Sequence, residues 1–560
     1  ADLGLALVLD ARSTLGLDLR IVAMSATLDG AAVAALLADA TGTPAPLVTS
    51  MGRSFPVTTQ YVGRGMPLLP GPESPERVVV LAVRRALGES PGDLLVFLPG
   101  AGEIRRVASM LEEGGGPAPG VRVLPLYGEL DPAAQDAALE PDRSGGRRIV
   151  LATNIAETSL TIPGIRIVID SGLVRRSVFD PATGMSRLET QRISRASADQ
   201  RQGRAGRVEA GVCYRLWSEG SHRSLAAATP PEIVDADLAP LALELAAWGT
   251  ADVASLRWLD APPTAMLAAA RDLLRRLGAL DATDRLLSYG RDLARLPAHP
   301  RLAHLLQVAE ERDALQLGAD LAALLSERDL MRGGGRDGSG GGDTDIASRL
   351  DLLRRGQADR GVLMRVRQSS EQFRRAMRTP RSGSVPKARR DTSPGLLLAA
   401  AYPDRIGRRR GAVERRYALT NGRGAEFIDA DRLAQQEFIV AVELDDRDRE
   451  ARIRLAAALD RSDIESVCGE RIERRDEVEW SSRDEAVTAR RVERLDAIVL
   501  SEKPLNPPPT ELARAAMLAG LQVMGAVALP WDDDCRQLQA RVRFVRALPA
   551  EQAARWPDLD

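Results

Sequence analysis

The chain has 560 residues, of which 44% are hydrophobic and 28% charged, and its formal net charge is −2. This length predicts about four domains with real cores, and the near-neutral charge means that any nucleic-acid contact has to use local basic stripes. Aromatic residues make up only 3%, so few rings are available to stack on bases. Cys213, Cys468 and Cys535 lie far apart; this excludes a disulfide framework or zinc site and favours free thiols in the cytoplasm.

Two absences restrict the chemistry. The only lysines are Lys387 and Lys503, and neither follows a glycine-rich loop, so the phosphate-binding pattern G-x-x-x-x-G-K-[ST] does not occur. No apolar run is long enough to cross a bilayer, and we expect no membrane association. The chain begins at Ala1 in a pattern already under way, which we interpret as a fragment.

The first fifty residues resemble the tail of an α/β domain. An apolar helical segment over 3–9 precedes a β-rich run over 19–24, the tripeptide Ser25, Ala26 and Thr27, and a helix over 31–40. Taken alone, Ser25 and Thr27 are suited to capping that helix.

Repeated alternation of strands and helices follows. We expect strands over 55–62, 93–99, 121–126, 148–153 and 165–170, and helices over 74–87, 103–111 and 132–139. Apolar strands without alternation are typical of a parallel sheet covered on both faces. Ligands of such sheets lie at the carboxyl ends of the strands, where Gly100, the stretch 153–161 and a later helix at Gln200 would meet.

The stretch from Ser194 to Arg207, SRASADQRQGRAGR, has the features of a phosphate sensor. Ser197 and Gln200 have capping-box spacing, which predicts a helix start, and Gln200, Arg204 and Arg207 would then share one helix face. Gly203 and Gly206 remove bulk beside them, so that a ligand or another surface can come close. Guanidinium groups suit phosphate oxygens; a surface helix with solvated arginines is the alternative, and the stretch alone does not decide between them.

The sequence after residue 207 predicts several smaller domains. Helices over 237–248 and 263–277, with a hairpin over 279–288 turning at Asp284, suggest a winged helix. A helical region over 290–378 is broken by a glycine-rich loop at 333–342, the basic stretch 374–390 favours a linker, and Arg405 and Arg408–Arg410 lie near a β-rich segment typical of an oligonucleotide-binding (OB) barrel. His299 and His304 favour packing or capping over metal ligation, and we expect no metal site formed by this chain.

Four motifs occur in the order and with the spacing of a known protein family. SAT at 25–27, FLPG at 97–100, ATNIAETSLTIPG at 152–164 and QRQGRAGR at 200–207 resemble the later motifs of DEAH-box (superfamily 2) ATP-dependent RNA helicases. WLDAPP at 258–263, GRDLARLPAHPRLAH at 290–304, AYPDRIGRRR at 401–410 and LTNGRGA at 419–425 resemble the bacterial HrpB type. The resemblance covers essentially the whole chain.

The resemblance implies a multidomain α/β and α+β fold. The expected domains are 1–53, the remnant of a first RecA-like lobe; 54–222, the second RecA-like lobe; 223–290, a winged helix; 291–380, a helical bundle; 381–437, a linker and OB-like segment; and 438–560, a C-terminal domain.

The resemblance also assigns roles. ATP or another NTP with Mg²⁺ would bind between two lobes, with the phosphate loop and most Mg²⁺ ligands upstream of Ala1. Gln200 would lie near the γ-phosphate, Arg204 and Arg207 would act as arginine fingers, and Gly203 would belong to the same nucleotide site. The other assigned residues are Ser159 for sensing the γ-phosphate, Thr161 for the ribose, Ser25, Ala26 and Thr27 for coupling, and Gly100, Thr153 and Asn154 for the nucleic-acid backbone.

Two positions depart from the family pattern. The aromatic residue that stacks on adenine is replaced by Leu139, and an acidic residue two positions after Thr161 is replaced by Pro163, so selectivity for ATP over other NTPs is open. The function that we expect is 3′-to-5′ translocation on single-stranded RNA or DNA driven by NTP hydrolysis, with this polypeptide inactive alone. The alternative is a non-catalytic nucleic-acid-binding module.

Overall fold

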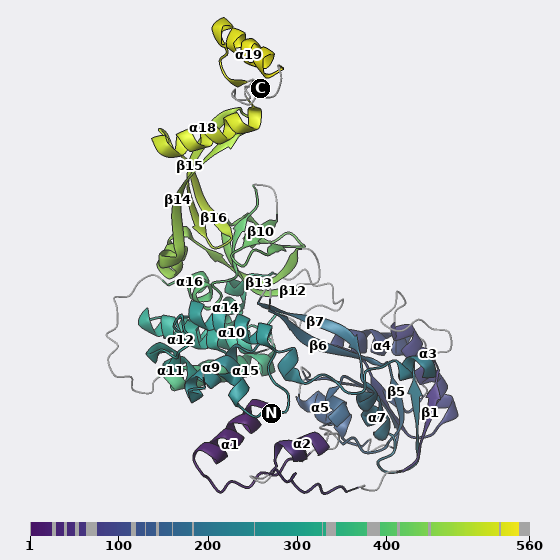
Figure 1. Ribbon diagram of the computed structural model, residues 1–560. Helices are drawn as coiled ribbons and strands as arrows, with labels where there is room; N and C mark the ends of the chain where they lie inside the picture. The colour runs from purple at the N-terminus through teal and green to yellow at the C-terminus, as the bar shows by residue number, and fades with distance from the viewer. Residues whose placement is uncertain are drawn as a thin grey trace.

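The computed structural model describes the chain except residues 1, 25–29, 39–41, 51–54, 63–74, 114–118, 129, 131, 142–144, 159–160, 182–183, 251, 328, 332–342, 378–391, 412–414, 446–449, 526–527 and 548–560. A sheet-containing lobe and a helical region lie side by side, with a small barrel above the helices and a long sheet projecting from the barrel (Figure 1). The predicted multidomain fold with a RecA-like parallel sheet is confirmed. The glycine-rich loop at 333–342 falls outside the described residues.

The lobe is built on a six-stranded sheet with the order β1-β8-β5-β2-β4-β3, and each neighbouring pair is parallel. The central strands are buried apolar runs, as the sequence predicts. The strands are β1 (Val57–Tyr61), β2 (Asp93–Phe97), β3 (Val121–Leu126), β4 (Arg147–Ala152), β5 (Ile165–Asp170) and β8 (Gly211–Arg215).

Helices cover both faces of this sheet. Leu94 and Val96 of β2 pack against one layer, and Leu95 and Phe97 of the same strand pack against the other, as alternation along a strand requires. The first layer is α3 (Pro75–Glu89) and α4 (Ala101–Glu113); the second includes α5 (Pro132–Leu139), α6 (Ile155–Thr158) and α7 (Arg195–Gly203). A separate hairpin of β6 (Leu173–Asp180) and β7 (Met185–Arg192) reaches from the lobe toward the barrel (Figure 1).

The N-terminal segment holds two helices, α1 (Asp2–Thr14) and α2 (Gly30–Leu36). The strand predicted over 19–24 is wrong: these residues have no strand assignment, and Val22 and Met24 are exposed. A strand needs a neighbouring ladder, and none of the described strands pairs with this run. Helix α1 instead packs on the helices that follow the lobe, where Trp248 donates a hydrogen bond from Nε1 to Oδ2 of Asp10 at 2.7 Å.

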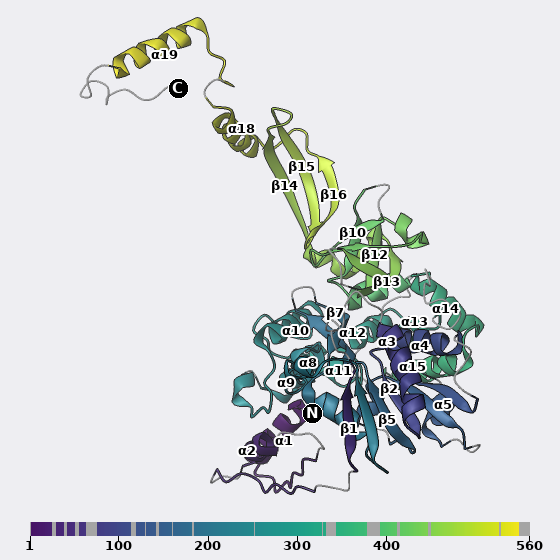
Figure 2. The same cartoon turned by 90° about the vertical axis from the view of Figure 1, so that its right-hand side faces the viewer.

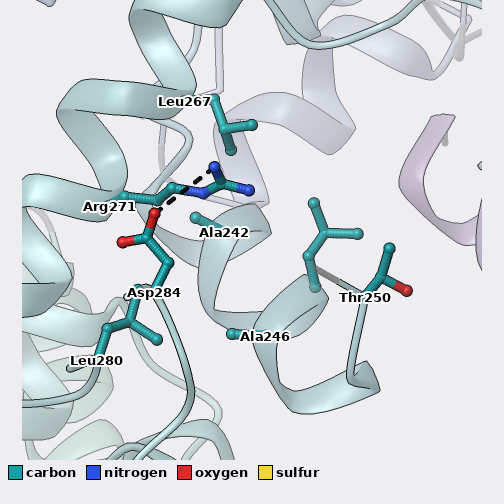
Figure 3. A pocket seen from close by; sticks show the side chains of 8 residues that line it. Ala242, Ala246, Thr250, Leu267, Arg271, Leu280 and Asp284 are labelled. Atoms are coloured by element: carbon teal, nitrogen blue, oxygen red, sulfur yellow. Dashed lines mark ion pairs between the residues drawn. The ribbon is translucent and has the colours of Figure 1, made fainter. Parts of the chain in front are cut away.

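After the lobe, which ends with α8 (Glu219–Arg223), come α9 (Ala239–Trp248), α10 (Thr264–Arg276), α11 (Ser288–Ala294) and the short 3₁₀ helices η1 (Glu232–Val234) and η2 (Val253–Ser255). The hairpin predicted over 279–288 is reduced to one antiparallel bridge between Leu280 and Leu286, with Asp284 in the turn at φ 64°. Figure 3 shows the hollow beside it, where Arg271 pairs with Asp284 at 3.7 Å. At about 20 Å³ this hollow has room for a single water and excludes a larger ligand.

The helical region continues through α12 (Pro300–Glu311), α13 (Leu315–Ser326), α14 (Ile346–Arg355), α15 (Arg360–Met377) and α16 (Pro394–Ala401). The start of the predicted basic linker, 374–377, forms the last turn of α15, because Met377 is buried in the core. His299 caps α12 by accepting a hydrogen bond from the Arg301 backbone N–H at 3.2 Å, in agreement with the predicted capping role. None of the described helices is long and apolar enough to pass through a membrane.

Protonation of His304 is expected to destabilise this region in acid. Its ring lies 2.6 Å from the Tyr289 hydroxyl, and burial lowers the pKa of His304 to about 4, against about 6.5 when unfolded. The unfolded state therefore binds the extra proton first, so stability should fall as the pH drops from 6.5 to 4, by up to about 3 kcal/mol. Thermal unfolding of wild type and His304→Gln over this range would test this.

The His304→Gln variant should lose much of that pH dependence, because glutamine does not take up a proton in this range. An unchanged acid slope in His304→Gln would contradict the assignment.

A closed five-stranded barrel with the order β10-β11-β13-β12-β9 follows the helices. It extends through residue 459, so the expected domain boundary between 437 and 438 is wrong because it cuts the barrel. The reason is that β12 and β13 pair with each other and with β9 and β11, and this pairing is non-local. Its elements are β9 (Ile406–Arg409), β10 (Arg416–Leu419), β11 (Gly424–Glu426), η3 (Arg432–Gln435), β12 (Phe438–Asp445) and β13 (Ala451–Leu459).

The C-terminal part is an antiparallel sheet that projects from the barrel and has α18 and α19 at its far end (Figure 2). Ion pairs connect its strands, such as Arg474 with Glu493 at 2.8 Å and Arg491 with Asp476 at 2.8 Å. At its base, Asp496 accepts a hydrogen bond from Arg276 of α10 at 2.9 Å. The elements are α17 (Arg461–Cys468), η4 (Gly469–Arg471), β14 (Ile472–Ser481), β15 (Ala486–Leu495), β16 (Ile498–Pro504), α18 (Thr510–Met524) and α19 (Asp533–Arg546).

Candidate nucleotide site and nucleic-acid interface

Three predicted backbone-binding residues lie at the carboxyl ends of parallel strands. Gly100 follows β2, and Thr153 and Asn154 follow β4, with the Thr153 N–H donating to the Leu126 carbonyl at the end of β3 at 3.2 Å. A Cβ on Gly100 would come within 2.6 Å of the Arg175 guanidinium. Glycine at this position therefore leaves space for Arg175 of β6, which pairs with Glu103 at 3.0 Å.

Helix α7 starts earlier and ends earlier than predicted. Its N-cap is Ser194, whose Oγ accepts the Ser197 N–H at 3.1 Å, and its last residue is Gly203. Ser197 is thus inside the first turn, and its own hydroxyl donates to Oε1 of Glu157 at 2.7 Å. The prediction that Gln200, Arg204 and Arg207 share one helix face is wrong, because the helix stops at a glycine and the two arginines lie in the following turn.

A buried arginine holds α7 against the neighbouring motif. Arg201 donates from Nε to Oε2 of Glu157 at 2.9 Å and from its guanidinium to Oδ1 of Asp170 at 2.9 Å. Its guanidinium carbon lies 4.8 Å from the centroid of the Phe97 ring. Burial lowers the pKa of Arg201, but the carboxylates of Asp170 and Glu157 outweigh burial and raise it overall. One side chain thereby joins α7 to the ends of two strands, β2 and β5, and to α6.

The two predicted finger residues both reach the segment that precedes Gly164. Arg204 is buried and donates to the backbone carbonyl of Glu157. Arg207 is exposed and donates to Oγ1 of Thr161 at 2.5 Å, so Arg207 and Thr161, both predicted nucleotide-site residues, are in direct contact. Burial, and next the neighbouring charge of Arg207, lower the pKa of Arg204 to about 10. An anion between the two guanidinium groups would relieve that repulsion.

The other predicted site residues are placed less directly. Gln200 is half-buried on α7, and Gly203 is exposed with open space around its Cα. Gly206 packs against the chain itself, since a Cβ there would lie 2.6 Å from the Phe55 carbonyl oxygen. Leu139 is partly buried against the apolar cluster of Phe97. Ser25, Ala26, Thr27 and Ser159 lie outside the described residues.

Sequence reasoning missed Glu157, Arg201 and Asp170. Arg201 stands inside the quoted motif, but only its neighbours were assigned roles. Asp170 ends an otherwise apolar buried strand, and a buried carboxylate requires a counter-charge. The need of Asp170 for a counter-charge could therefore have predicted that an arginine lies beside it.

A nucleotide phosphate fits these residues. Two guanidinium groups, one of them exposed, and the Thr161 hydroxyl lie together on the segment that leads from α6 into β5. The described residues contain no group of three or more His, Cys, Asp or Glu side chains suited to a metal ion.

A cleft of about 620 Å³ lies between the β6–β7 hairpin, the start of α12 and the barrel. Its wall carries charged groups of both signs, Arg187, Asp237, Arg301, Arg405, Glu443, Asp445 and Arg454. The cleft therefore brings charged side chains of the lobe, of α12 and of the barrel together.

Comparison with known proteins gives consistent results. Residues 78–209 match the helicase conserved C-terminal domain, and residues 471–505 match the connector region of ATP-dependent RNA helicase HrpB. The chain is 38% identical to Escherichia coli ATP-dependent RNA helicase HrpB over all of its own length and 64% of that protein. It is also 37% identical to the Schizosaccharomyces pombe pre-mRNA-splicing factor ATP-dependent RNA helicase prp22, over 55% of this chain and 26% of that protein.

Solved structures agree with the sequence relatives. A crystal structure of E. coli DExH-box NTPase HrpB matches with a TM-score of 0.74 at 36% identity, covering 100% of this chain and 64% of that one. A crystal structure of E. coli DEAH/RHA helicase HrpB gives 0.75 at 35% identity, covering 100% and 66%. The chain therefore spans less than two thirds of the length of the E. coli HrpB protein.

Proposed function

Since this chain belongs to the HrpB type of DEAH-box RNA helicases, we propose that it supplies one side of the nucleotide site of an NTP-driven 3′-to-5′ translocase on single-stranded RNA. The observation that carries this proposal is the convergence of Arg204 and Arg207 on the segment containing Glu157 and Thr161. The family implies use of a nucleotide and Mg²⁺. When bound, the nucleotide with Mg²⁺ would supply the phosphoryl-transfer reaction in which the γ-phosphate is released.

Each residue of the site has a separate task in this proposal. Arg207 and Arg204 direct positive charge at the triphosphate and stabilise the charge that builds up during phosphoryl transfer. Gln200 orients the attacking water, Ser159 senses the γ-phosphate, and Thr161 lies near the ribose. Arg201 contacts no ligand in this scheme; it fixes α7 so that the two fingers keep their geometry.

The nucleic-acid strand would pass Gly100, Thr153 and Asn154. Gly100 and Asn154 offer backbone N–H groups, Thr153 a hydroxyl and Asn154 an amide; such groups bind phosphates and sugars and carry no sequence information. We therefore propose low sequence specificity and leave DNA as a second substrate. Leu139 and Pro163 provide neither an aromatic ring nor a carboxylate for adenine, and we propose that NTPs other than ATP are also accepted.

A second candidate function is a non-catalytic nucleic-acid-binding module. It is favoured by one observation: neither lysine of the 560 residues lies in a phosphate-loop motif. A single lobe with finger residues lacks the phosphate loop that binds the triphosphate and the carboxylate that binds Mg²⁺.

An NTPase and binding assay on the purified chain separates the two candidates. We expect no RNA-stimulated phosphate release from the chain alone, but binding of a labelled oligouridylate by fluorescence anisotropy, with an affinity that falls as salt rises. Turnover above background would contradict the assignment of a single side of the site. Absence of RNA binding would contradict both functions.

A further inference from the structure

The tip of the β6–β7 hairpin is tied to the barrel by one side chain. Arg405 donates from one guanidinium nitrogen to the backbone carbonyl of Gly184 at 2.9 Å and from the other to that of Val442 at 2.7 Å. Gly184 lies at the turn of the hairpin, and Val442 belongs to β12 of the barrel. Strand β7 also packs against β12. The guanidinium therefore bridges the sheet lobe and the barrel through two carbonyl oxygens.

Arg405 is itself held by a buried ion pair. Arg301, at the start of α12, forms a forked pair with Asp404 at 2.6 and 2.8 Å and also donates to the Ala401 carbonyl at 3.0 Å. Both Arg301 and Arg405 lie near the Tyr402 ring, with guanidinium carbons 5.0 and 5.1 Å from its centroid. These contacts fix the backbone on which Arg405 stands.

The electrostatics of the cluster make the two carbonyl contacts important. Burial, and next the charge of Arg301, lower the pKa of Arg405. Burial alone would raise the pKa of Asp404, but Arg301 overrides it and lowers the pKa to about 2, so this carboxylate is ionised at neutral pH. It pairs with Arg301 and lies 3.7 Å from Nε of Arg405. The carbonyls of Gly184 and Val442 each accept from one terminal nitrogen of Arg405, whereas its buried Nε has no hydrogen-bond partner among the described residues.

We propose that Arg405 is a positioning residue that latches the tip of the β6–β7 hairpin to the barrel. A hydrogen bond to a charged group in a buried setting is stronger than an exposed one. Movement of the sheet lobe away from the barrel has to break the bond to Gly184, while the bond to Val442 keeps Arg405 on the barrel side. The hairpin forms one wall of the 620 Å³ cleft, so the latch also sets the width of that cleft.

The role of the latch in translocation rests on the proposed function. If the sheet lobe moves with the nucleotide state, each movement either carries the barrel along or opens the latch. The latch itself can be tested without nucleotide or turnover.

Hydrogen–deuterium exchange of the whole chain tests the latch. In Arg405→Ala, amides of residues 185–188 should exchange roughly tenfold faster, because the carbonyl of Gly184 loses its donor and the hairpin tip opens locally. Arg405→Lys keeps the charge but has no planar fork that could contact both carbonyls. The amides of residues 185–188 should therefore exchange at a rate between those of the wild type and of Arg405→Ala. Arg408→Ala is the matched control, since Arg408 donates to the Val499 carbonyl at 2.6 Å and makes no contact with the hairpin that the structure records.

Each outcome decides. Faster exchange at 185–188 in Arg405→Ala and not in Arg408→Ala supports the latch. Unchanged exchange at the hairpin would overturn it, as would a uniform increase across the barrel and helices, which indicates a purely structural role. Wild-type exchange in Arg405→Lys would overturn the two-carbonyl fork. Oligouridylate anisotropy on the same proteins reports separately on the proposed function, and its failure would leave the exchange result standing.

Discussion

Replacing Arg201 with alanine is expected to destabilise the sheet lobe by about 3–5 kcal/mol, the cost of breaking a buried ion pair by removing one partner. The variant leaves Asp170, which is fully buried, and Glu157 without their shared cation. The stacking contact with Phe97 is lost as well. Denaturant titration followed by exchange of β5 amides would measure the loss within this lobe alone.

Arg223→Ala provides the matched control for this experiment. Arg223 forms an exposed i,i+4 pair with Glu219 at 3.1 Å, and such pairs contribute only about 0.5 kcal/mol. Arg201→Lys should give an intermediate loss, because an ammonium cannot contact both carboxylates in the same fork. A loss below about 1 kcal/mol in Arg201→Ala would show that the buried network does not stabilise the lobe.

The second large effect is expected on catalysis. In an enzyme that joins this chain to a lobe carrying the phosphate loop, Arg204→Ala should lower RNA-stimulated NTP turnover about a thousandfold, the order of magnitude associated with an arginine finger. RNA affinity should change little, because Arg204 contacts Glu157 of the nucleotide side and not the strand ends at Gly100 or Asn154. Steady-state phosphate release and anisotropy on the same protein separate the two quantities.

Arg195→Ala serves as the control for the finger experiment, since Arg195 is an exposed arginine at the first position of the same helix. It should leave turnover within about twofold of wild type. Parallel loss of turnover and RNA binding in Arg204→Ala would contradict a finger role. So would full activity in the variant.

Sequence patterns predicted the buried strands well because those patterns are local. Strands β2, β4 and β5 begin and end within about two residues of expectation, since each is a short apolar run bounded by Gly, Pro or polar residues. The same logic failed at 19–24, where an apolar run has no ladder beside it among the described strands. It also failed for the barrel, whose parallel pairing of β11 with β13 leaves no local trace.

The sequence predicted several residues of the candidate site but not the bounds of helix α7 or the contacts of Arg201. The motifs located Arg204, Arg207 and Thr161, and the structure brings the last two together. The helix start was misplaced by three residues because Ser194 and Ser197 are both suitable caps, and only the chain entering from β7 selects the first. Arg201 was missed because its partners come from segments 31 and 44 positions away in sequence.

The sheet of β14, β15 and β16 has a mechanical consequence. Its ten-residue strands span about 33 Å, and the sheet is attached at one end, where Asp496 meets Arg276. A tilt of about 10° at this base would carry the far end, and α18 with it, through about 6 Å. A small rotation at the base is therefore enough to displace the tip by more than the roughly 5.4 Å pitch of one helical turn.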